Sequence, residues 1–325
     1  MGLSEFDLIN RYFGRGGALK PSRPDVELGI GDDAAVVNVP AGQSLVMSLD
    51  TLVAGIHFPD HTSAEDIAYK ALAVNLSDMA AMAAEPGWFM LGLTLPQADE
   101  AWLAGFSAGL SQLANQYDLA LIGGDTTHGS LTVSIQINGL VPHGQALKRR
   151  GAQPGDLIYV SGQLGDAGLG LQLALAGLDI DLTAQRQQYF LQRLNRPTPR
   201  LELGLALRGL ATAAIDVSDG LLADLGHILK ASGVGASINL EQLPVADEVR
   251  GLSESWWSMP LTAGDDYELC FTVPAARRLA FEGKIQGLEC PCSCIGKIET
   301  ESGLNLLLDG CRIDSENLKG YLHFD

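Results

Sequence analysis

Two features are missing from this sequence: long apolar runs and an excess of positive charge. No stretch reaches the roughly 18 uninterrupted apolar residues that a membrane-spanning helix requires. The first residues, MGLSEFDLINRYFGRGG, lack a long apolar run and carry Glu5 and Asp7, so we expect no signal peptide. The net charge of −18 argues against binding to nucleic acid or to an anionic membrane, both of which attract basic surfaces. We therefore expect a soluble, cytoplasmic protein without nucleic-acid or membrane partners.

Cysteine is scarce, and its spacing indicates no metal site. The 325 residues include 5 cysteines, of which Cys290, Cys292 and Cys294 lie close together. This spacing lacks the second CxxC pair that is typical of a zinc site. A disulfide framework is typical of much shorter secreted chains. We interpret the three cysteines as part of a strand or of its entry.

The signatures of several enzyme classes are also absent. The sequence contains no GxxxxGK[ST] loop, no GxSxG elbow, no HExxH pair and no protein-kinase set of Gly-rich loop, paired Lys and DFG. Gly29-Ile30-Gly31 followed by Ala34 imitates a dinucleotide fingerprint. However, Asp32 and Asp33 would repel a pyrophosphate at that place. If a nucleotide binds, we expect it to bind through metal ions.

The sequence has instead a recurring pattern of isolated aspartates among small residues. It occurs in GIGDDAAV (29–36), SLDT (48–51), NLSD (75–78), GGDTT (123–127), IDVSDG (215–220) and GDDY (264–267). Each Asp alone could be a helix cap or a turn residue. Carboxylates that converge repel one another unless cations lie among them, and divalent cations with oxygen ligands are the usual solution. The pattern therefore indicates a divalent-metal enzyme that acts on phosphates, with Arg149 and Arg150 as a source of positive charge.

Length and composition predict two α/β domains. A chain of 325 residues with 46% hydrophobic residues can bury a core in each of two domains. The basic, turn-rich segment 142–155 is the best boundary, and we place the domains at 1–148 and 149–325. Both halves mix helices and strands. Expected helices cover 3–13, 96–116, 185–194, a segment from Ser63 to the stop at Pro86-Gly87, and segments after Asp166 and Gly220. Expected strands cover 44–53, 88–95, 119–122, 132–141, 156–160, 213–217, 267–273, 292–298 and 304–308.

Taken in order, the motifs resemble the thiamine-monophosphate kinase family over essentially the whole chain. The motifs are GIGDDAAV, SLDTLVAGIHF, YKALAVNLSDMAAMAAEP, LIGGDTT, RRGAQPGDLIYVSGQLGDA, NRPTPR, AAIDVSDGL and TAGDDYEL. That family belongs to the wider superfamily of aminoimidazole ribonucleotide synthetase and selenophosphate synthetase. Each motif alone is moderately specific, whereas the ordered set is highly specific.

The resemblance implies an activity and an architecture. The enzyme would transfer the γ-phosphoryl group of ATP to thiamine monophosphate by direct in-line transfer, giving thiamine diphosphate, with several Mg²⁺ ions. We expect no side chain to act as a catalytic base, because the acceptor is a phosphate monoester that is largely ionised at neutral pH. The fold would be the two-domain, aminoimidazole ribonucleotide synthetase-like α/β fold. Its N-terminal domain would bind ATP and Mg²⁺ and form a homodimer through a β-barrel, and its C-terminal domain would be α/β.

The resemblance also implies roles for single residues. Metal ligands would be Asp33, Ser48, Leu49 through its backbone, Asp50, Asp78, Asp125, Asp216 and Asp219. ATP contacts would be Gly124, Asp125, Arg149 and Ser218, and thiamine contacts would be His57, Asp265 and Tyr321. Two residues depart from the family pattern: Ala54 and Asp265 stand where Glu is usual. The adjacent Arg149 and Arg150 are both candidates for the ATP contact.

Two alternative functions stay open at this point. The first is another ATP-dependent synthetase of the same superfamily; the early reactive Cys or selenocysteine loop of a selenophosphate enzyme is absent. The second is a non-enzymatic acidic module that binds divalent cations. Such a module would bind metal without consuming ATP, and it would not account for the basic segment Lys148–Arg150.

Overall fold

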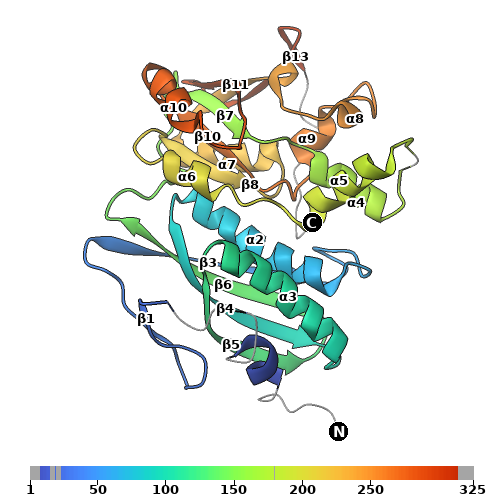
Figure 1. Cartoon of the computed structure of the whole chain (residues 1–325). Helices are drawn as coiled ribbons and strands as arrows, with labels where there is room; N and C mark the ends of the chain where they lie inside the picture. Colours follow the sequence, from blue (N-terminus) through green and yellow to red (C-terminus); the bar gives the residue numbers. More distant parts are fainter. Residues whose placement is uncertain (1–7, 15–18, 20–22, 179, 314–325) are drawn as a thin grey trace. The chain divides into compact units, whose positions relative to one another are not determined.

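The computed structural model of the chain describes residues 8–14, 19, 23–178 and 180–313 (Figure 1). The chain forms two compact units, Met1–Met79 with Ala84–Gly144 and Ala80–Ala83 with Gln145–Asp325. We call them the N-terminal and the C-terminal unit. The boundary expected after residue 148 lies a few residues past this break and stays a prediction. Among the described residues, none of the helices combines the length and the apolarity of a membrane-spanning segment.

The N-terminal unit is built on a four-stranded sheet with the order β3-β6-β4-β5. The strands are β3 (Gln43–Val53), β6 (Thr132–Pro142), β4 (Glu85–Leu95) and β5 (Ala120–His128). β3 and β4 pair antiparallel with β6, whereas β4 and β5 are parallel. The strands expected at 44–53, 88–95 and 132–141 are confirmed. β1 (Val26–Leu28) and β2 (Val36–Val37) form a separate antiparallel pair.

Two helices run across one face of this sheet, α2 (Ala64–Ala81) and α3 (Glu100–Gln116) (Figure 1). On that face the alternating residues Val133, Ile135 and Ile137 of β6 are fully buried. The Ser63 hydroxyl accepts the Asp66 N–H at 3.1 Å, which confirms the predicted start of α2. The expected helix at 3–13 lies partly outside the described residues, and Ile9–Phe13 forms the π-helix η1.

The opposite face of the sheet exposes apolar side chains. Leu45, Met47 and Leu49 of β3 are 38%, 64% and 61% exposed. β3 is also an edge strand of its sheet. Within the described part of the chain the sheet is open, so one copy does not form a closed barrel.

Three expectations in this unit are wrong in extent. The helix expected from Pro96 begins only at Glu100, because the Asp99 side chain caps it by accepting the Trp102 N–H at 2.7 Å. α2 was expected to continue to Pro86-Gly87 but ends at Ala81, because Ala83 adopts a left-handed conformation (φ 54°) and the Ala84 N–H donates to the Met79 carbonyl at 2.8 Å. Pro86 consequently lies inside β4. The strand expected at 119–122 continues to His128, because its residues stay paired with β4.

The C-terminal unit contains a seven-stranded mixed sheet with the order β13-β12-β9-β11-β7-β10-β8. Its strands are β7 (Leu157–Ser161), β8 (Ala213–Val217), β9 (Gly235–Asn239), β10 (Glu268–Val273), β11 (Cys292–Glu299), β12 (Gly303–Leu308) and β13 (Cys311–Ile313). All expected strands are confirmed to within a residue or two. β9, which pairs parallel with β12, was not predicted.

The helices of this unit are mostly short. They are α4 (Asp166–Ala174), α5 (Ala184–Asn195), α6 (Leu201–Ala206), α7 (Leu221–Ser232), α8 (Asp247–Arg250), α9 (Ser258–Thr262) and α10 (Arg278–Ile285), with the 3₁₀ turns η2 (Leu240–Gln242) and η3 (Ala275–Arg277). Strand residues such as Ile158, Val160 and Ile215 share one apolar core with Leu225 and Ile228 of α7. This core fixes the strand ends that carry the remaining candidate residues.

Candidate functional site

Three predicted metal ligands lie together between β3 and α2. The Ser48 hydroxyl donates to Oδ2 of Asp78, and Asp50 lies two residues further along β3. Burial, followed by the negative charge of Asp78, raises the pKa of Asp50 to about 7 from 3.8. The side chain of Leu49 is exposed on the other face, so only its backbone could serve as a ligand. Two carboxylates that repel each other beside a hydroxyl form a donor set that suits a hard divalent cation.

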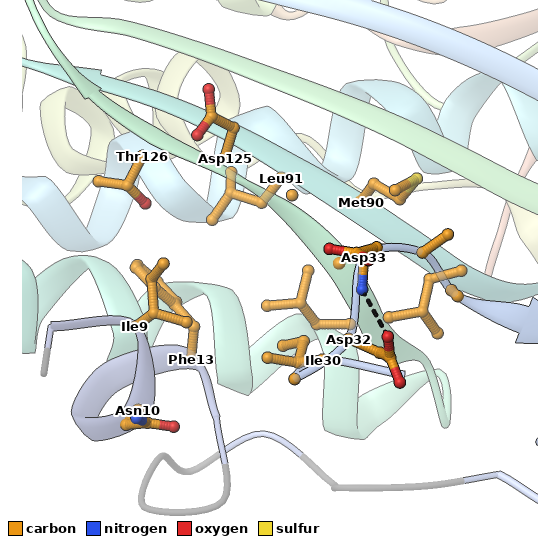
Figure 2. Close-up of a pocket in the computed structure, with 17 residues that line it drawn as sticks. Ile9, Asn10, Phe13, Ile30, Asp32, Asp33, Met90, Leu91, Asp125 and Thr126 are labelled. Atoms are coloured by element: carbon orange, nitrogen blue, oxygen red, sulfur yellow. Dashed lines mark hydrogen bonds between the residues drawn. The ribbon is translucent and has the colours of Figure 1, made fainter. Parts of the chain in front are cut away.

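A second pair of predicted ligands, Asp33 and Asp125, lines a cavity of about 710 Å³ in the same unit (Figure 2). Asp32 and Asp33 lie on one side of this cavity, and Ile9 and Phe13 on another. Oδ1 of Asp32 accepts the Asp33 N–H at 2.9 Å, which closes the turn after Gly31. The pair thus combines carboxylates with apolar walls in one recess.

Gly124, a predicted ATP contact, lines the same cavity for a backbone reason. It has a φ of +149°, and a Cβ at this position would lie 1.9 Å from the Leu91 carbonyl oxygen. Only glycine therefore lets β5 approach β4 closely enough to hold Asp125 in register.

The structure places these two groups of predicted ligands on different faces of the sheet. Across the four strands, Asp125 of β5 lies opposite Gly92 of β4, Gly92 lies opposite Ser134 of β6, and Ser134 lies opposite Thr51 of β3. Asp50 is the neighbour of Thr51 and therefore lies on the opposite face of the sheet. Within the described residues, His, Cys, Asp and Glu side chains form no group of three or more arranged to hold a metal ion. Each group alone could therefore supply only part of a coordination shell.

His57, a predicted thiamine contact, is held by the loop that follows β3. The Val53 N–H donates to His57 Nδ1 at 3.0 Å, so the neutral ring carries its proton on Nε2. The buried ammonium of Lys70 in α2 donates to the His57 carbonyl at 3.1 Å. This arrangement makes Nε2–H of the neutral imidazole a hydrogen-bond donor.

In the C-terminal unit, Asp216 and Asp219 flank the end of β8. Asp216 is buried within the strand, and Asp219 precedes Gly220, whose φ is +103°. The Asp219 N–H donates to Oδ2 of Asp224 at 3.0 Å. Burial raises the pKa of Asp224 to about 7. The hydrogen bond from the Asp219 N–H opposes this rise, the charge of the Asp219 carboxylate adds to it, and the charge of Arg149 opposes it.

Asp224 was missed by the sequence reasoning. It is an acidic residue in the first turn of the helix after the Asp219-Gly220 motif, and that position was the available signal. The positive charge of Arg149 lowers the pKa of Asp224, which brings this candidate ATP contact into the same group of residues.

Asp265, a predicted thiamine contact, lies beside Ser218, a predicted ATP contact. The Asp265 N–H donates to the Ser218 carbonyl at 2.9 Å. Asp265 has a φ of 70°, a conformation that costs free energy for a residue other than glycine. Tyr321 lies outside the described residues. Cys292 and Cys294 belong to β11, as the strand interpretation predicted.

Comparison with known proteins places the chain in a class. The family models of the N-terminal and C-terminal domains of AIR synthase related proteins match residues 31–141 and 153–309. The chain therefore belongs to the AIR synthase related proteins and has their two-domain α/β fold.

More similar relatives specify the family within that class. Thiamine-monophosphate kinase of Salmonella typhimurium (strain LT2) is 50% identical over 330 residues, which cover 100% of this chain and 99% of that protein. The crystal structure of thiamine-monophosphate kinase from Stenotrophomonas maltophilia K279a is 48% identical, with a TM-score of 0.82 over 89% of this chain and 92% of that one. AaThiL complexed with AMPPCP and TMP is 30% identical, with a TM-score of 0.76 over 91% and 92%. The chain belongs to the thiamine-monophosphate kinase family, which confirms the resemblance.

Proposed function

We propose that this protein transfers the γ-phosphoryl group of ATP to thiamine monophosphate, forming thiamine diphosphate and ADP. The observation that carries this proposal is the 50% identity to thiamine-monophosphate kinase over the whole chain. AaThiL, which has the same fold, holds AMPPCP, an analogue of ATP, together with TMP. Because the phosphoryl donor is ATP, we place the reaction in the cytoplasm.

Mg²⁺ is the cofactor that the carboxylates suit best. Ser48, Asp50 and Asp78 would hold it on one side of the sheet, Asp33 and Asp125 on the other, and Asp216 and Asp219 in the C-terminal unit. The raised pKa of Asp50 supports this assignment, because a cation would relieve the repulsion from Asp78. When bound, Mg²⁺ supplies positive charge that lets two phosphate groups approach each other.

The remaining residues would bind and orient the two substrates. Gly124, Arg149 and Ser218 would contact ATP, and His57, Asp265 and Tyr321 would contact the thiamine portion. His57 would donate Nε2–H to an acceptor such as a pyrimidine nitrogen of thiamine, and as a neutral group it would not repel the cationic thiazolium ring. A general base is unnecessary because the acceptor oxygen is already ionised, so positioning accounts for most of the chain's own contribution.

The protein is proposed to act as a homodimer through the N-terminal unit, with a β-barrel formed from both sheets. The exposed apolar side chains of Leu45, Met47 and Leu49 on the edge strand support this proposal. Met47→Lys would place a charge in the middle of that surface and is expected to weaken dimerisation at least about tenfold. Light scattering coupled to size exclusion tests this, with exposed Leu279→Lys in the C-terminal unit as the control.

The activity is tested directly with purified protein, ATP, thiamine monophosphate and Mg²⁺. Chromatography should show ADP and thiamine diphosphate in equal amounts, and EDTA should abolish both. ADP formation without thiamine diphosphate would reject the acceptor and favour another ATP-dependent enzyme of the class. Mg²⁺ binding without ADP formation would favour the non-enzymatic module.

A further inference from the structure

The two adjacent aspartates of the GDDYEL motif have different environments in the C-terminal unit. Asp265 is partly exposed, whereas Asp266 is completely buried. We propose that Asp266, together with Arg193, is a positioning residue that holds Asp265 in place for the thiamine end of the acceptor. This inference rests on the proposed function and assigns a role to a residue that contacts no substrate itself.

The turn that carries Asp265 is strained and is held from one side by β8. Asp265 and Tyr267 both have positive φ, at 70° and 48°. Their N–H groups donate to the carbonyls of Ser218 and Val217 at 2.9 and 2.8 Å. Strained backbone of this kind persists only where the surrounding structure fixes it. These two bonds hold one side of the turn against the end of β8, close to Asp216. The other side of the turn needs separate contacts.

Asp266 holds that other side through its carboxylate. Oδ2 accepts the Gly165 N–H at 2.6 Å, and Oδ1 accepts the Ala167 N–H at 3.2 Å. Both donors lie at the start of α4, where N–H groups have no partner inside the helix. Each carboxylate oxygen thus has a donor, and the direction of the Asp266 side chain is fixed.

Arg193 of α5 holds the same residue through its backbone. Its Nη2 donates to the Asp266 carbonyl at 3.2 Å and to Oε1 of Glu268 at 2.8 Å. Glu268 is itself buried and accepts two hydrogen bonds from Arg200, at 2.6 and 2.7 Å. Asp266 is therefore fixed at both its side chain and its carbonyl, and the backbone of Asp265 has little freedom to rotate.

A purely structural role for Asp266 predicts a different result from a positioning role, and a double-mutant cycle separates them. Asp266→Asn keeps the size of the side chain but replaces one acceptor oxygen by an NH₂ group, which faces a donor N–H. If Asp266 acts through Asp265, this change should raise KM for thiamine monophosphate about tenfold and leave KM for ATP within about twofold. In an Asp265→Ala background, the same change should have no further effect on KM for thiamine monophosphate.

Hydrogen exchange gives a readout that is independent of activity. In Asp266→Asn, the amides of Asp265 and Tyr267 should exchange at least about tenfold faster in the free protein, because their bonds to the Ser218 and Val217 carbonyls open more often. Asp156→Asn is the matched control: Asp156 is also buried and accepts the Gln153 N–H and the Thr212 hydroxyl, but it precedes β7 at the end of the sheet remote from the turn. Asp156→Asn should lower the melting temperature without changing KM for thiamine monophosphate, KM for ATP, or the exchange of the Asp265 and Tyr267 amides.

The outcomes are decisive in both directions. An equal rise of KM for thiamine monophosphate with and without Asp265, or an equal rise of both KM values, would overturn the proposal. If Asp266→Asn does not fold, Arg193→Lys removes the bond to the Asp266 carbonyl while keeping the charge, and it is judged by the same cycle. Failure of the proposed function would appear in the unmodified protein as absence of thiamine diphosphate, whatever the variants show.

Discussion

Both units of this protein contain carboxylates that are at least half-buried, but their surroundings differ. In the C-terminal unit, Glu268 lies between the guanidinium groups of Arg193 and Arg200. In the N-terminal unit, Asp50 is half-buried near a second carboxylate, Asp78, which raises its pKa further. Where arginines of the chain neutralise a buried carboxylate, as around Glu268, the ion pairs fix the structure. Repulsion between neighbouring acids leaves a site that an external cation would stabilise.

The largest effect should follow from removing a proposed metal ligand of the N-terminal unit. Asp78→Ala or Asp125→Ala is expected to lower kcat at least about a thousandfold, because charge stabilisation at the transferring phosphoryl group would be lost. The melting temperature should change little or even rise for Asp78→Ala, since repulsion is removed. Steady-state rates and thermal unfolding measure the two quantities. The control is Glu100→Ala, which removes an exposed ion pair with Arg11.

Near-normal rates in both aspartate variants would show that these acids are ordinary structural residues and not metal ligands. A large loss of stability in Asp78→Ala, without any loss of rate, would lead to the same conclusion for Asp78.

The opposite pattern is expected for a buried carboxylate that arginines neutralise. Glu268→Gln would leave the largely buried guanidinium groups of Arg193 and Arg200 without this carboxylate and should lower the free energy of unfolding by about 3–5 kcal/mol. Urea denaturation of the whole chain measures the change. Mg²⁺ should stabilise this variant as much as it stabilises the unmodified protein. If Mg²⁺ no longer stabilised Glu268→Gln, Glu268 would belong to the metal site, and it could not be separated from the metal-binding acids as a structural residue.

Much of the fold, but less of the site, could be predicted from the sequence. Alternation in residues 132–141 and the apolar run at 213–217 revealed strands that the structure confirms. The end of α2 was missed because nothing in the sequence marks Ala83 as left-handed. The full length of β5 was missed because Gly123-Gly124 resembles a strand end, whereas pairing with β4 continues through it.

The grouping of the acids depends on tertiary structure and so escaped prediction. The motifs identify Asp50 and Asp125 separately, but only the strand order places them on opposite faces of one sheet. Arg193 and Glu268 meet across 75 positions of sequence, so no local pattern reveals their ion pair. The roles assigned to single aspartates by family resemblance stay predictions until the variants are measured.

Mg²⁺ binding near Asp50 should depend on pH. The pKa of Asp50 is raised from 3.8 to about 7, so the folded protein without metal retains a proton that the unfolded chain loses. This group's contribution to stability therefore decreases as pH rises from about 4 to about 7. Mg²⁺ requires the ionised carboxylate, so its apparent affinity should fall up to about tenfold per pH unit below that pKa.

Thermal unfolding with and without Mg²⁺ measures this effect. The rise in melting temperature caused by Mg²⁺ should be clearly larger at about pH 8 than at about pH 6. Asp50→Asn should make the rise smaller and nearly independent of pH. An equal Mg²⁺ effect at both values in the unmodified protein would show that Asp50 does not titrate with the metal.

The smallest effect on KM is expected from substitutions of His57. The His57 ring is held at its Nδ1 atom, whereas Asp266 is held at both its carboxylate and its carbonyl. Val53 N–H occupies Nδ1, so a substrate contact must use Nε2–H. The amide nitrogen of Gln can stand near the position of Nε2, whereas that of Asn stands near Nδ1. His57→Gln should therefore raise KM for thiamine monophosphate only about twofold, and His57→Asn about tenfold. Nitrogen chemical shifts of the ring test the tautomer independently. Equal KM values for the two variants, or a proton on Nδ1, would remove the donor role of His57.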